Sequence, residues 1–207
     1  MDFITDPNRI EERSMEIIAP HLAGRNLSPA ETKVYSRIIH AAGDVDYANH
    51  IRIHPEAIVA AGEAFRSGCD IFCDVEMVRT GINRRRLADF GGSAHCLISD
   101  PSVAEAAQRA GITRAMAAVR AFGAQLDGAV VAIGNAPTAL FELIKIMGKT
   151  GLRPSLIVGV PVGFVGAAES KELLAATSPV PYITVAGTKG GSPIAAATVN
   201  ALLYMQD

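Results

Sequence analysis

Apolar side chains follow helical spacing in the first part of the chain. Between residues 7 and 20 they recur at intervals of three and four, which predicts an amphipathic helix. The segment Ser28-Pro29-Ala30-Glu31 combines an N-cap serine, a proline suited to the first helical position and the glutamate of a capping box, so a second helix is expected over residues 29–42. A third is expected over residues 55–68. The face of the first helix that should be buried contains Ile10, Ile17 and Ile18, with Ser14 among them.

Short β-rich runs alternate with helical patterns from residue 70 onward. The runs are continuously apolar, as expected for parallel strands that are buried on both faces. Their alternation with helices predicts a three-layer, doubly wound α/β fold of the flavodoxin type, with five parallel strands. We expect these strands at residues 70–74, 95–99, 130–134, 156–160 and 182–186, and helices at 103–110, 114–126, 138–147, 170–176 and 194–205.

The length of 207 residues suits one domain. We expect residues 1–207 to form a single domain in which a helical N-terminal extension, residues 1–68, packs on an α/β core, residues 69–207. Charged side chains are concentrated in the first hundred residues, which hold 26, whereas residues 101–207 hold 14. The second half is therefore expected to be mostly core or interface.

The composition excludes several classes of protein. With 49% apolar and 19% charged residues, the chain can form a packed core and is not disordered. A net charge of −2 and only 5% aromatic residues argue against nucleic-acid binding. The first residues lack a signal peptide's apolar region, and no stretch approaches the ~18 uninterrupted apolar residues of a membrane span. We therefore expect a cytoplasmic protein without a membrane partner.

The three cysteines, Cys69, Cys73 and Cys96, are odd in number and come without a secretion signal. This argues against a disulfide framework. Their spacing would allow a metal site, but small buried cysteines on strands are the simpler interpretation, and we expect no metal.

Three segments follow predicted strands and lead into predicted helices: residues 135–138, 161–171 and 187–193, of which the last two contain glycines. Ligands of open parallel sheets bind at the carboxyl ends of the strands, and the free N–H groups of helix N-termini favour anions. These segments predict a binding cleft, with ordinary tight turns as the alternative. Neither GxxxxGK[ST] nor GxGxxG occurs, so a nucleotide cofactor is not supported.

Polar residues form one stripe along the second predicted helix: Lys33, Arg37, His40 and Asp44. Arg37 and His40 are three positions apart and can meet on one face. Such a pair suits the binding of a carboxylate while histidine moves a proton, because histidine ordinarily titrates near pH 6.5. The alternative is a solvated helix face. The excess of 14 Arg over 5 Lys is a weak indication of an anionic ligand.

Three other features have two interpretations each. Ser14 either bonds its own helix backbone or faces a cleft. Asp74 follows a strand, where it is either a catalytic acid or a helix cap. The run Arg84-Arg85-Arg86 is either a solvated surface or a contact for a carboxylate-rich ligand.

Long segments of the chain strongly resemble the precorrin-8X methylmutase family, also called cobalt-precorrin-8 methylmutase. The resemblance extends over essentially the whole chain, including the closing Gly190-Gly191-Ser192. The segments that carry it are Glu12–Ser14, Arg37–Ala41, Cys73–Val78, Ala132–Leu140 and Gly159–Lys171.

The resemblance implies an isomerase of cobalamin biosynthesis. A methyl group moves from C-11 to C-12 of the corrinoid, which turns precorrin-8X into hydrogenobyrinate, or cobalt-precorrin-8 into cobyrinate. By the same resemblance, His40 is the catalytic proton donor and acceptor, and the substrate is bound by Ser14, Arg37 and, further along the chain, Arg114. The resemblance assigns no role to Asp44.

The resemblance further implies a homodimer with clefts at the subunit interface and no redox cofactor, because the reaction is an isomerisation. Two alternatives remain at this point: a tetrapyrrole carrier without chemistry, and a flavodoxin-like flavin or nucleotide protein.

Overall fold

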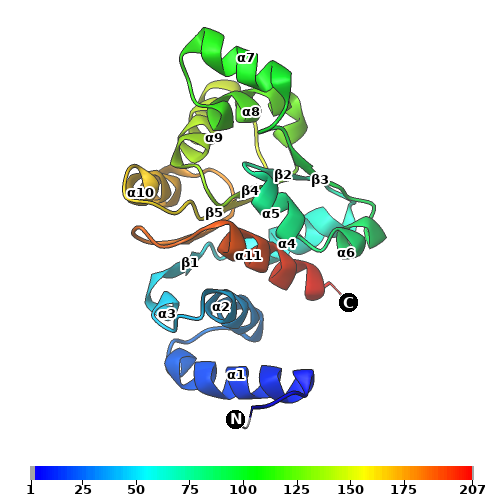
Figure 1. The fold of residues 1–207 in the computed structure, drawn as a ribbon, viewed down its shortest axis with the longest axis vertical. Helices are drawn as coiled ribbons and strands as arrows, with labels where there is room; N and C mark the ends of the chain where they lie inside the picture. Colours follow the sequence, from blue (N-terminus) through cyan, green and yellow to red (C-terminus); the bar gives the residue numbers. More distant parts are fainter. Residues whose placement is uncertain (1–2, 207) are drawn as a thin grey trace.

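The computed structural model describes residues 3–206, which form a six-stranded sheet between helical layers (Figure 1). The strand order across the sheet is β1-β6-β5-β4-β2-β3. Strands β2 to β6 are parallel, and their order is that of a flavodoxin-like sheet. The strands are β1 (Ile51–Ile53), β2 (Ile71–Cys73), β3 (Ala94–Cys96), β4 (Val130–Ile133), β5 (Leu156–Gly159) and β6 (Tyr182–Val185).

The predicted α/β class, doubly wound order and five parallel strands are confirmed, but the sheet is mixed and has six strands. Strand β1 pairs antiparallel with the outer edge of β6, with Arg52 opposite Thr184. Two backbone bonds extend the pairing, from the His54 N–H to the Tyr182 carbonyl and from the Ala186 N–H to the His50 carbonyl. A three-residue strand is too short for periodicity to reveal, and its place depends on a partner more than 120 residues away.

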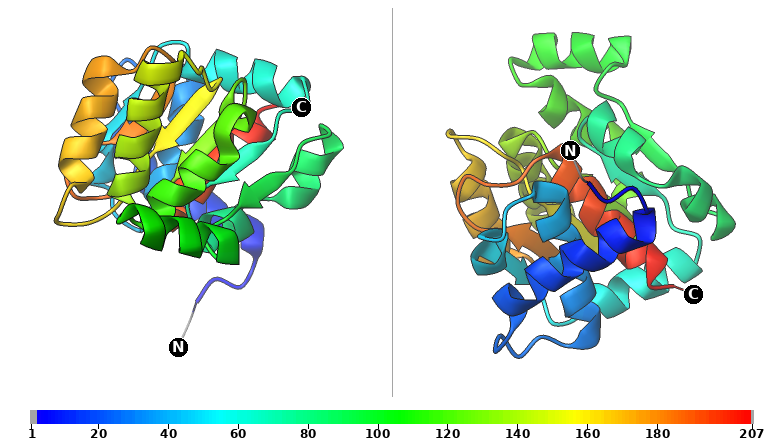
Figure 2. Two further views of the ribbon diagram at one scale, coloured as in Figure 1. Left: turned by 90° about the horizontal axis from the view of Figure 1, so that it is seen from above. Right: turned by 60° about the horizontal axis from the view of Figure 1, so that its bottom comes forward.

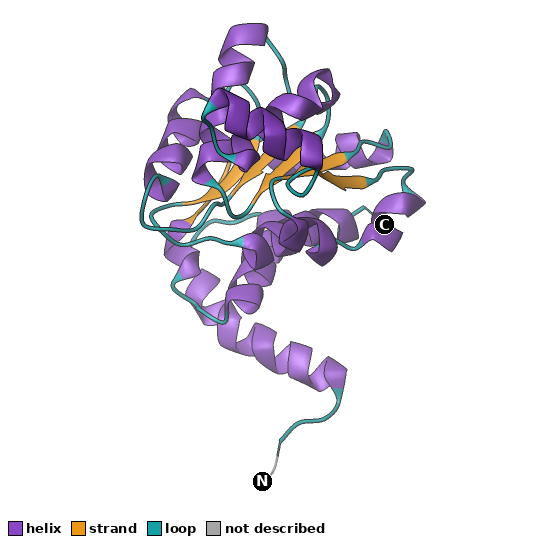
Figure 3. Cartoon of the chain, turned by 45° about the horizontal axis from the view of Figure 1, so that its top comes forward, coloured by secondary structure: helices purple, strands orange, loops and turns teal. Residues whose placement is uncertain are grey.

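Helices cover both faces of the sheet (Figures 1 and 3). On one face lie α7 (Pro101–Ala110), α8 (Arg114–Phe122), α9 (Pro137–Thr150) and α10 (Ala167–Thr177). The other face is covered by α11 (Ser192–Tyr204), which contacts α2, α4, α5 and α6. The remaining helices are α1 (Pro7–Leu22), α2 (Pro29–Ala42), α3 (Tyr47–His50), α4 (Ala57–Arg66), α5 (Glu76–Gly81) and α6 (Arg84–Asp89).

The beginning of α2 forms as its sequence predicts. The side-chain oxygen of Ser28 accepts a hydrogen bond from the Glu31 N–H at 3.2 Å, and the Ser28 N–H donates to the Glu31 carboxylate at 2.8 Å. At its other end, Gly43 has a φ of +62°, a left-handed conformation that glycine adopts without strain. Residues 29–42 are therefore helical for reasons that are visible in the local sequence.

The expected burial of one face of α1 is only partly correct. Ile18 is buried, but Ile10 is 44% exposed and Ile17 is 52% exposed. The reason is the position of α1, which lies outermost in the molecule and packs mainly against α2 (Figure 2). Within one chain, α1 therefore leaves apolar surface uncovered.

Short helices and the cysteines complete the fold. Helices α3, α5 and α6 have four to six residues and were not predicted, because so few residues show no helical period. All three cysteines are free, with Cys73 buried on β2. Among residues 3–206, no helix has the length and apolar character needed to cross a membrane.

Candidate active site

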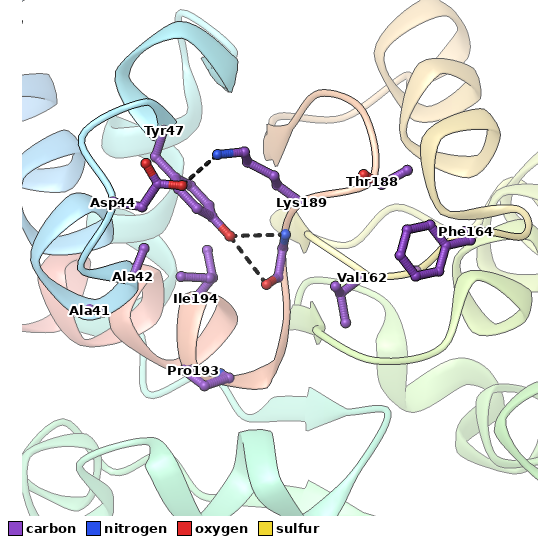
Figure 4. Close-up of a pocket in the computed structure, with 12 residues that line it drawn as sticks. Ala41, Ala42, Asp44, Tyr47, Val162, Phe164, Thr188, Lys189, Pro193 and Ile194 are labelled. Carbon is purple, nitrogen blue, oxygen red and sulfur yellow. Dashed lines mark hydrogen bonds and ion pairs between the residues drawn. The ribbon is translucent and has the colours of Figure 1, made fainter.

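A cavity of about 490 Å³ opens at the carboxyl ends of the parallel strands (Figure 4). It lies between the end of α2, the loop from β5 to α10, and the loop from β6 to α11. Two of the three predicted segments, residues 161–171 and 187–193, therefore meet at one cleft. Its lining residues include Ala41, Asp44, Tyr47, Val162, Phe164, Thr188, Lys189 and Gly190.

A polar cluster joins the two sides of this cleft (Figure 4). The Lys189 ammonium contacts the carboxylates of Asp44 at 2.5 Å and Asp46 at 3.0 Å. The hydroxyl of Tyr47 accepts a hydrogen bond from the Gly190 N–H at 3.1 Å. Hydrogen bonding to Lys189 lowers the pKa of Asp44, and bonds from Asn49, Lys189 and His50 lower the pKa of Asp46. These carboxylates are thus charged partners of the loop lysine.

The β6–α11 loop passes very close to the end of β5. Gly190 has a φ of +148°, and a side-chain carbon at this position would lie 2.3 Å from the Val160 carbonyl oxygen. The neighbouring Gly191 N–H donates to that same carbonyl at 2.9 Å. Glycine is required here because only a residue without a Cβ permits this approach.

Lys33, Arg37 and His40 of the predicted stripe lie on α2, but Asp44 does not, because the helix ends at Ala42 and Gly43 turns the chain. Arg37 lines a second hollow, a cavity of about 340 Å³ between α1, α2 and α11, whereas Asp44 lines the main cleft. His40 lies between them in the last turn of α2, and its side chain is exposed. Arg37 and His40 were predicted to share one face of a helix, and both lie on α2, three positions apart.

Ser14 lies half-buried on α1, one residue before Met15, which lines the second hollow. Its hydroxyl donates a hydrogen bond to the Ile10 carbonyl at 2.8 Å. Of the two sequence-based interpretations, the local backbone bond is thus present. The oxygen of the hydroxyl can still accept a hydrogen bond from a ligand.

Arg114 begins α8 on the opposite face of the sheet from α2 (Figure 1). The neighbouring Thr113 shares a hydrogen bond of 2.9 Å with Thr138 at the beginning of α9. Arg114 therefore lies at the carboxyl edge of the sheet, but across the sheet from His40. One chain does not bring all four predicted site residues into a single cavity within residues 3–206.

Asp74 binds the backbone at the third predicted segment, residues 135–138. Its side chain is 3% exposed, and its carboxylate accepts N–H donors from Gly134 at 3.0 Å, Asn135 at 2.8 Å and Ala136 at 2.7 Å. Burial raises the pKa of Asp74, while the three N–H donors act in the opposite direction. Asp74 thus holds the turn that leads into α9, and neither α9 nor α5, the helix that follows Asp74 in the chain, receives a side-chain cap from the described residues.

The remaining sequence features have other surroundings. Arg84 and Arg85 are exposed on α6, while the Arg86 guanidinium lies 5.1 Å from the centre of the Phe90 ring. Between Phe3 and Gln206, no group of three or more His, Cys, Asp or Glu side chains is placed to hold a metal ion. The contacts of Tyr47 and Lys189 across the cleft were not predicted, because each residue contacts a partner more than 140 positions away in the chain.

The fold and cleft define a class: a doubly wound α/β protein whose ligand site lies at the carboxyl ends of its parallel strands. Comparison with known families makes the assignment specific. The precorrin-8X methylmutase family model matches residues 9–205, so the chain belongs to that family, whose reaction is the isomerase step of cobalamin biosynthesis. The resemblance inferred from the sequence is confirmed.

Individual relatives are similar in sequence to this chain over nearly their full lengths. The cobalt-precorrin-8 methylmutase of Leptospira interrogans is 43% identical, with 95% of this chain and 92% of the relative covered. The precorrin-8X methylmutase of Pseudomonas aeruginosa is 44% identical, with coverages of 98% and 97%. The crystal structure of precorrin-8X methyl mutase from Thermus thermophilus matches with a TM-score of 0.86 at 37% identity, covering 95% of this chain and 96% of that one.

Proposed function

We propose that this protein moves a methyl group from C-11 to C-12 of precorrin-8X or cobalt-precorrin-8, giving hydrogenobyrinate or cobyrinate. The observation that carries this function is the family match over residues 9–205. The structure supports it with a cleft at the carboxyl edge, where a ligand of this fold is expected. The methyl group moves within one molecule, so the step has no net oxidation or reduction and consumes no redox cofactor.

His40 is the proton donor and acceptor in this proposal. It protonates a ring nitrogen near the migrating methyl group, which makes the conjugated system more electron-poor and favours migration. Return of the proton to the histidine then gives the product. Two observations support this role: the side chain is exposed, and the adjacent Ala41 lines the cleft. General acid–base assistance of this kind typically accelerates a reaction by roughly 10²–10⁴-fold.

Ser14, Arg37 and Arg114 bind the substrate in this proposal. The corrinoid carries acetate and propionate carboxylates around its rim, and an arginine guanidinium can hold a carboxylate through two parallel hydrogen bonds. Arg37 lines an open cavity, which supports its assignment directly. Arg114 is exposed at the same edge of the sheet but on its other face, so it is available to a substrate that extends beyond one cavity.

A homodimer completes the site in this proposal, with the cleft at the subunit interface. The support is apolar surface that one chain leaves uncovered: Phe3 is 76% exposed, and Ile10 and Ile17 on α1 are about half exposed. The cleft loop between β5 and α10 also exposes Phe164 at 94% and Val165 at 89%. Exposed apolar surface of this kind marks interaction sites.

The enzyme works in the cytoplasm in this proposal. Residues 1–207 act as one methylmutase domain, with residues 1–68 packed on residues 69–207. The single-domain organisation is supported by β1, which comes from the first segment and pairs with β6 of the second.

The function is tested by adding precorrin-8X to the purified protein and recording the absorption spectrum over time. The proposal predicts catalytic conversion to the hydrogenobyrinate spectrum, with many turnovers per protein chain. A tetrapyrrole carrier would instead change the spectrum once, in proportion to the protein added, and the extracted ligand would still be precorrin-8X. That result would contradict the proposed function. Separate runs with cobalt-precorrin-8 determine which of the two substrates is preferred.

A further inference from the structure

Lys171 is a buried lysine that the catalytic proposal does not use. It lies near the beginning of α10, and its side chain is 1% exposed. Its ammonium donates a hydrogen bond to the backbone carbonyl oxygen of Lys189 at 2.5 Å. Burial lowers the pKa of Lys171 to about 8, and burial is the only cause of this shift among the described residues.

This burial is costly for the folded state. Lysine is rarely buried without a charged partner, because its ammonium loses its hydration and a single neutral carbonyl replaces only part of it. An apolar side chain of similar length would fill the same space without that penalty. The presence of lysine at position 171 therefore suggests a role beyond packing.

The carbonyl that Lys171 holds belongs to the wall of the cleft. Lys189 directs its own side chain toward Asp44 and Asp46 at the other side of the cleft. The next residue, Gly190, is bonded to the hydroxyl of Tyr47 (Figure 4). Lys171 thus fixes the backbone of the β6–α11 loop from the α10 side, while the α2–α3 region fixes the same loop from the opposite side.

Two backbone bonds hold this loop independently of Lys171. The Gly163 N–H donates to the Thr188 carbonyl at 3.2 Å, and the Gly191 N–H donates to the Val160 carbonyl at 2.9 Å. We therefore expect the path of the loop to be kept when the lysine is replaced. The bond from Lys171 adds one contact, at the Lys189 carbonyl, between these two attachment points.

We propose that Lys171 is a positioning residue of the methylmutase: its buried ammonium holds the Lys189 carbonyl and thereby places Lys189 and Gly190 along the wall that receives the carboxylate-bearing substrate. The role rests on the proposed function only in naming that substrate. The placement of the loop is a property of the protein without ligand and can be measured separately.

The test compares Lys171→Met with Lys145→Met, which replaces an exposed lysine on α9. In Lys171→Met we expect KM to rise about tenfold, the effect of one lost hydrogen bond to a charged group, with kcat reduced less than threefold. The free energy of unfolding at pH 7 should be unchanged or higher, because a buried charge is removed. Lys145→Met should change neither constant.

Hydrogen exchange of the ligand-free proteins provides the second measurement. We expect the Gly190 amide to exchange faster in Lys171→Met, while the Gly191 amide, which is bonded to Val160, and the Val158 amide within β5 keep their wild-type rates. Unchanged exchange at Gly190 would overturn the positioning role whatever the activity. A KM within twofold of wild type would overturn it as well.

Lys171→Gln, which retains an N–H donor on a shorter chain, is the second variant. If Lys171→Met and Lys171→Gln both fail to fold, the lysine is required for folding, and the positioning role is wrong. If the wild-type enzyme converts no precorrin-8X, the proposed function fails, but the exchange experiment still decides the role of Lys171.

Discussion

Three turns lead from strands into helices at the carboxyl edge of the sheet, and they differ in what binds their backbone N–H groups. The turn from β4 to α9 is closed: the Asp74 carboxylate accepts three of its N–H groups. The loops before α10 and α11 are open. The N-caps of those two helices are glycines, Gly166 and Gly191, and like α9 neither helix receives a side-chain cap from the described residues.

This difference shows that the N–H groups of a strand-to-helix turn predict an anion site only when the protein does not supply its own anion. Asp74 lies 60 positions before Gly134, and the two meet because β2 and β4 are neighbours in the sheet. The open loops, by contrast, line the cleft together with the end of α2. We therefore assign stability to the closed turn and substrate binding to the open loops.

The largest effect is expected on the open side. His40→Ala should lower kcat by roughly 10²–10⁴-fold, because the proton transfer loses its donor and acceptor. The free energy of unfolding should change little, since the side chain is exposed. His21→Ala, which removes an exposed histidine on α1, is the matched control and should keep normal turnover. Normal turnover of His40→Ala would show that His40 is not the proton donor and acceptor of the reaction.

The second effect concerns the closed turn. Asp74→Ala should lower the free energy of unfolding by about 3 kcal/mol, because three N–H groups lose a charged acceptor. The substitution also turns the closed turn into an open one, so added formate should restore part of the loss. Urea unfolding with and without formate measures both effects. A variant as stable as wild type would show that Asp74 does not close this turn.

The third effect tests how tightly the open loop is held. Gly190→Ala should cost about 2 kcal/mol and raise KM, because the added carbon meets the Val160 carbonyl oxygen at a φ of +148°. Gly148→Ala is the control, since its added carbon meets no atom within 4 Å and helix α9 favours alanine. Equal stability and KM in both variants would show that the loop adapts freely.

The smallest effect is a pH dependence. The pKa of Lys171 is about 8 in the folded protein, below the ~10.4 of an unfolded lysine. Between these values the unfolded chain binds more protons, so stability rises with pH through this window. Relative to Lys171→Met, wild type should gain about 1–2 kcal/mol between pH 8 and pH 10. Urea unfolding of both proteins at each pH measures this difference in the free energy of unfolding. Because the two proteins share all other titrating groups, the contributions of those groups cancel. A constant difference would contradict the burial of a charged lysine.

The sequence predicts those parts of this architecture that depend on local pattern. The five parallel strands, the capping box at Ser28 and the polar stripe with Arg37 and His40 all follow from spacing and residue type. The stripe could be placed on α2 because helical geometry fixes which side chains share a face.

Contacts between distant segments could not be predicted in this way. The attachment of β1 to β6, the closure of the β4–α9 turn by Asp74, and the contacts of Lys189 with Asp44 and Asp46 each join residues far apart in the chain. The exposure of Ile10 and Ile17 was also missed, because an apolar helical face does not show which surface covers it.

The most direct test of the central claim is a crystal structure of the protein with a corrinoid bound. The account predicts that the macrocycle lies against the open β5–α10 and β6–α11 loops, with a His40 ring nitrogen about 2.6–3.2 Å from a ring nitrogen of the ligand. The β4–α9 turn should still be filled by Asp74. A corrinoid bound with a carboxylate in place of Asp74, or with His40 out of reach of the macrocycle, would contradict the account.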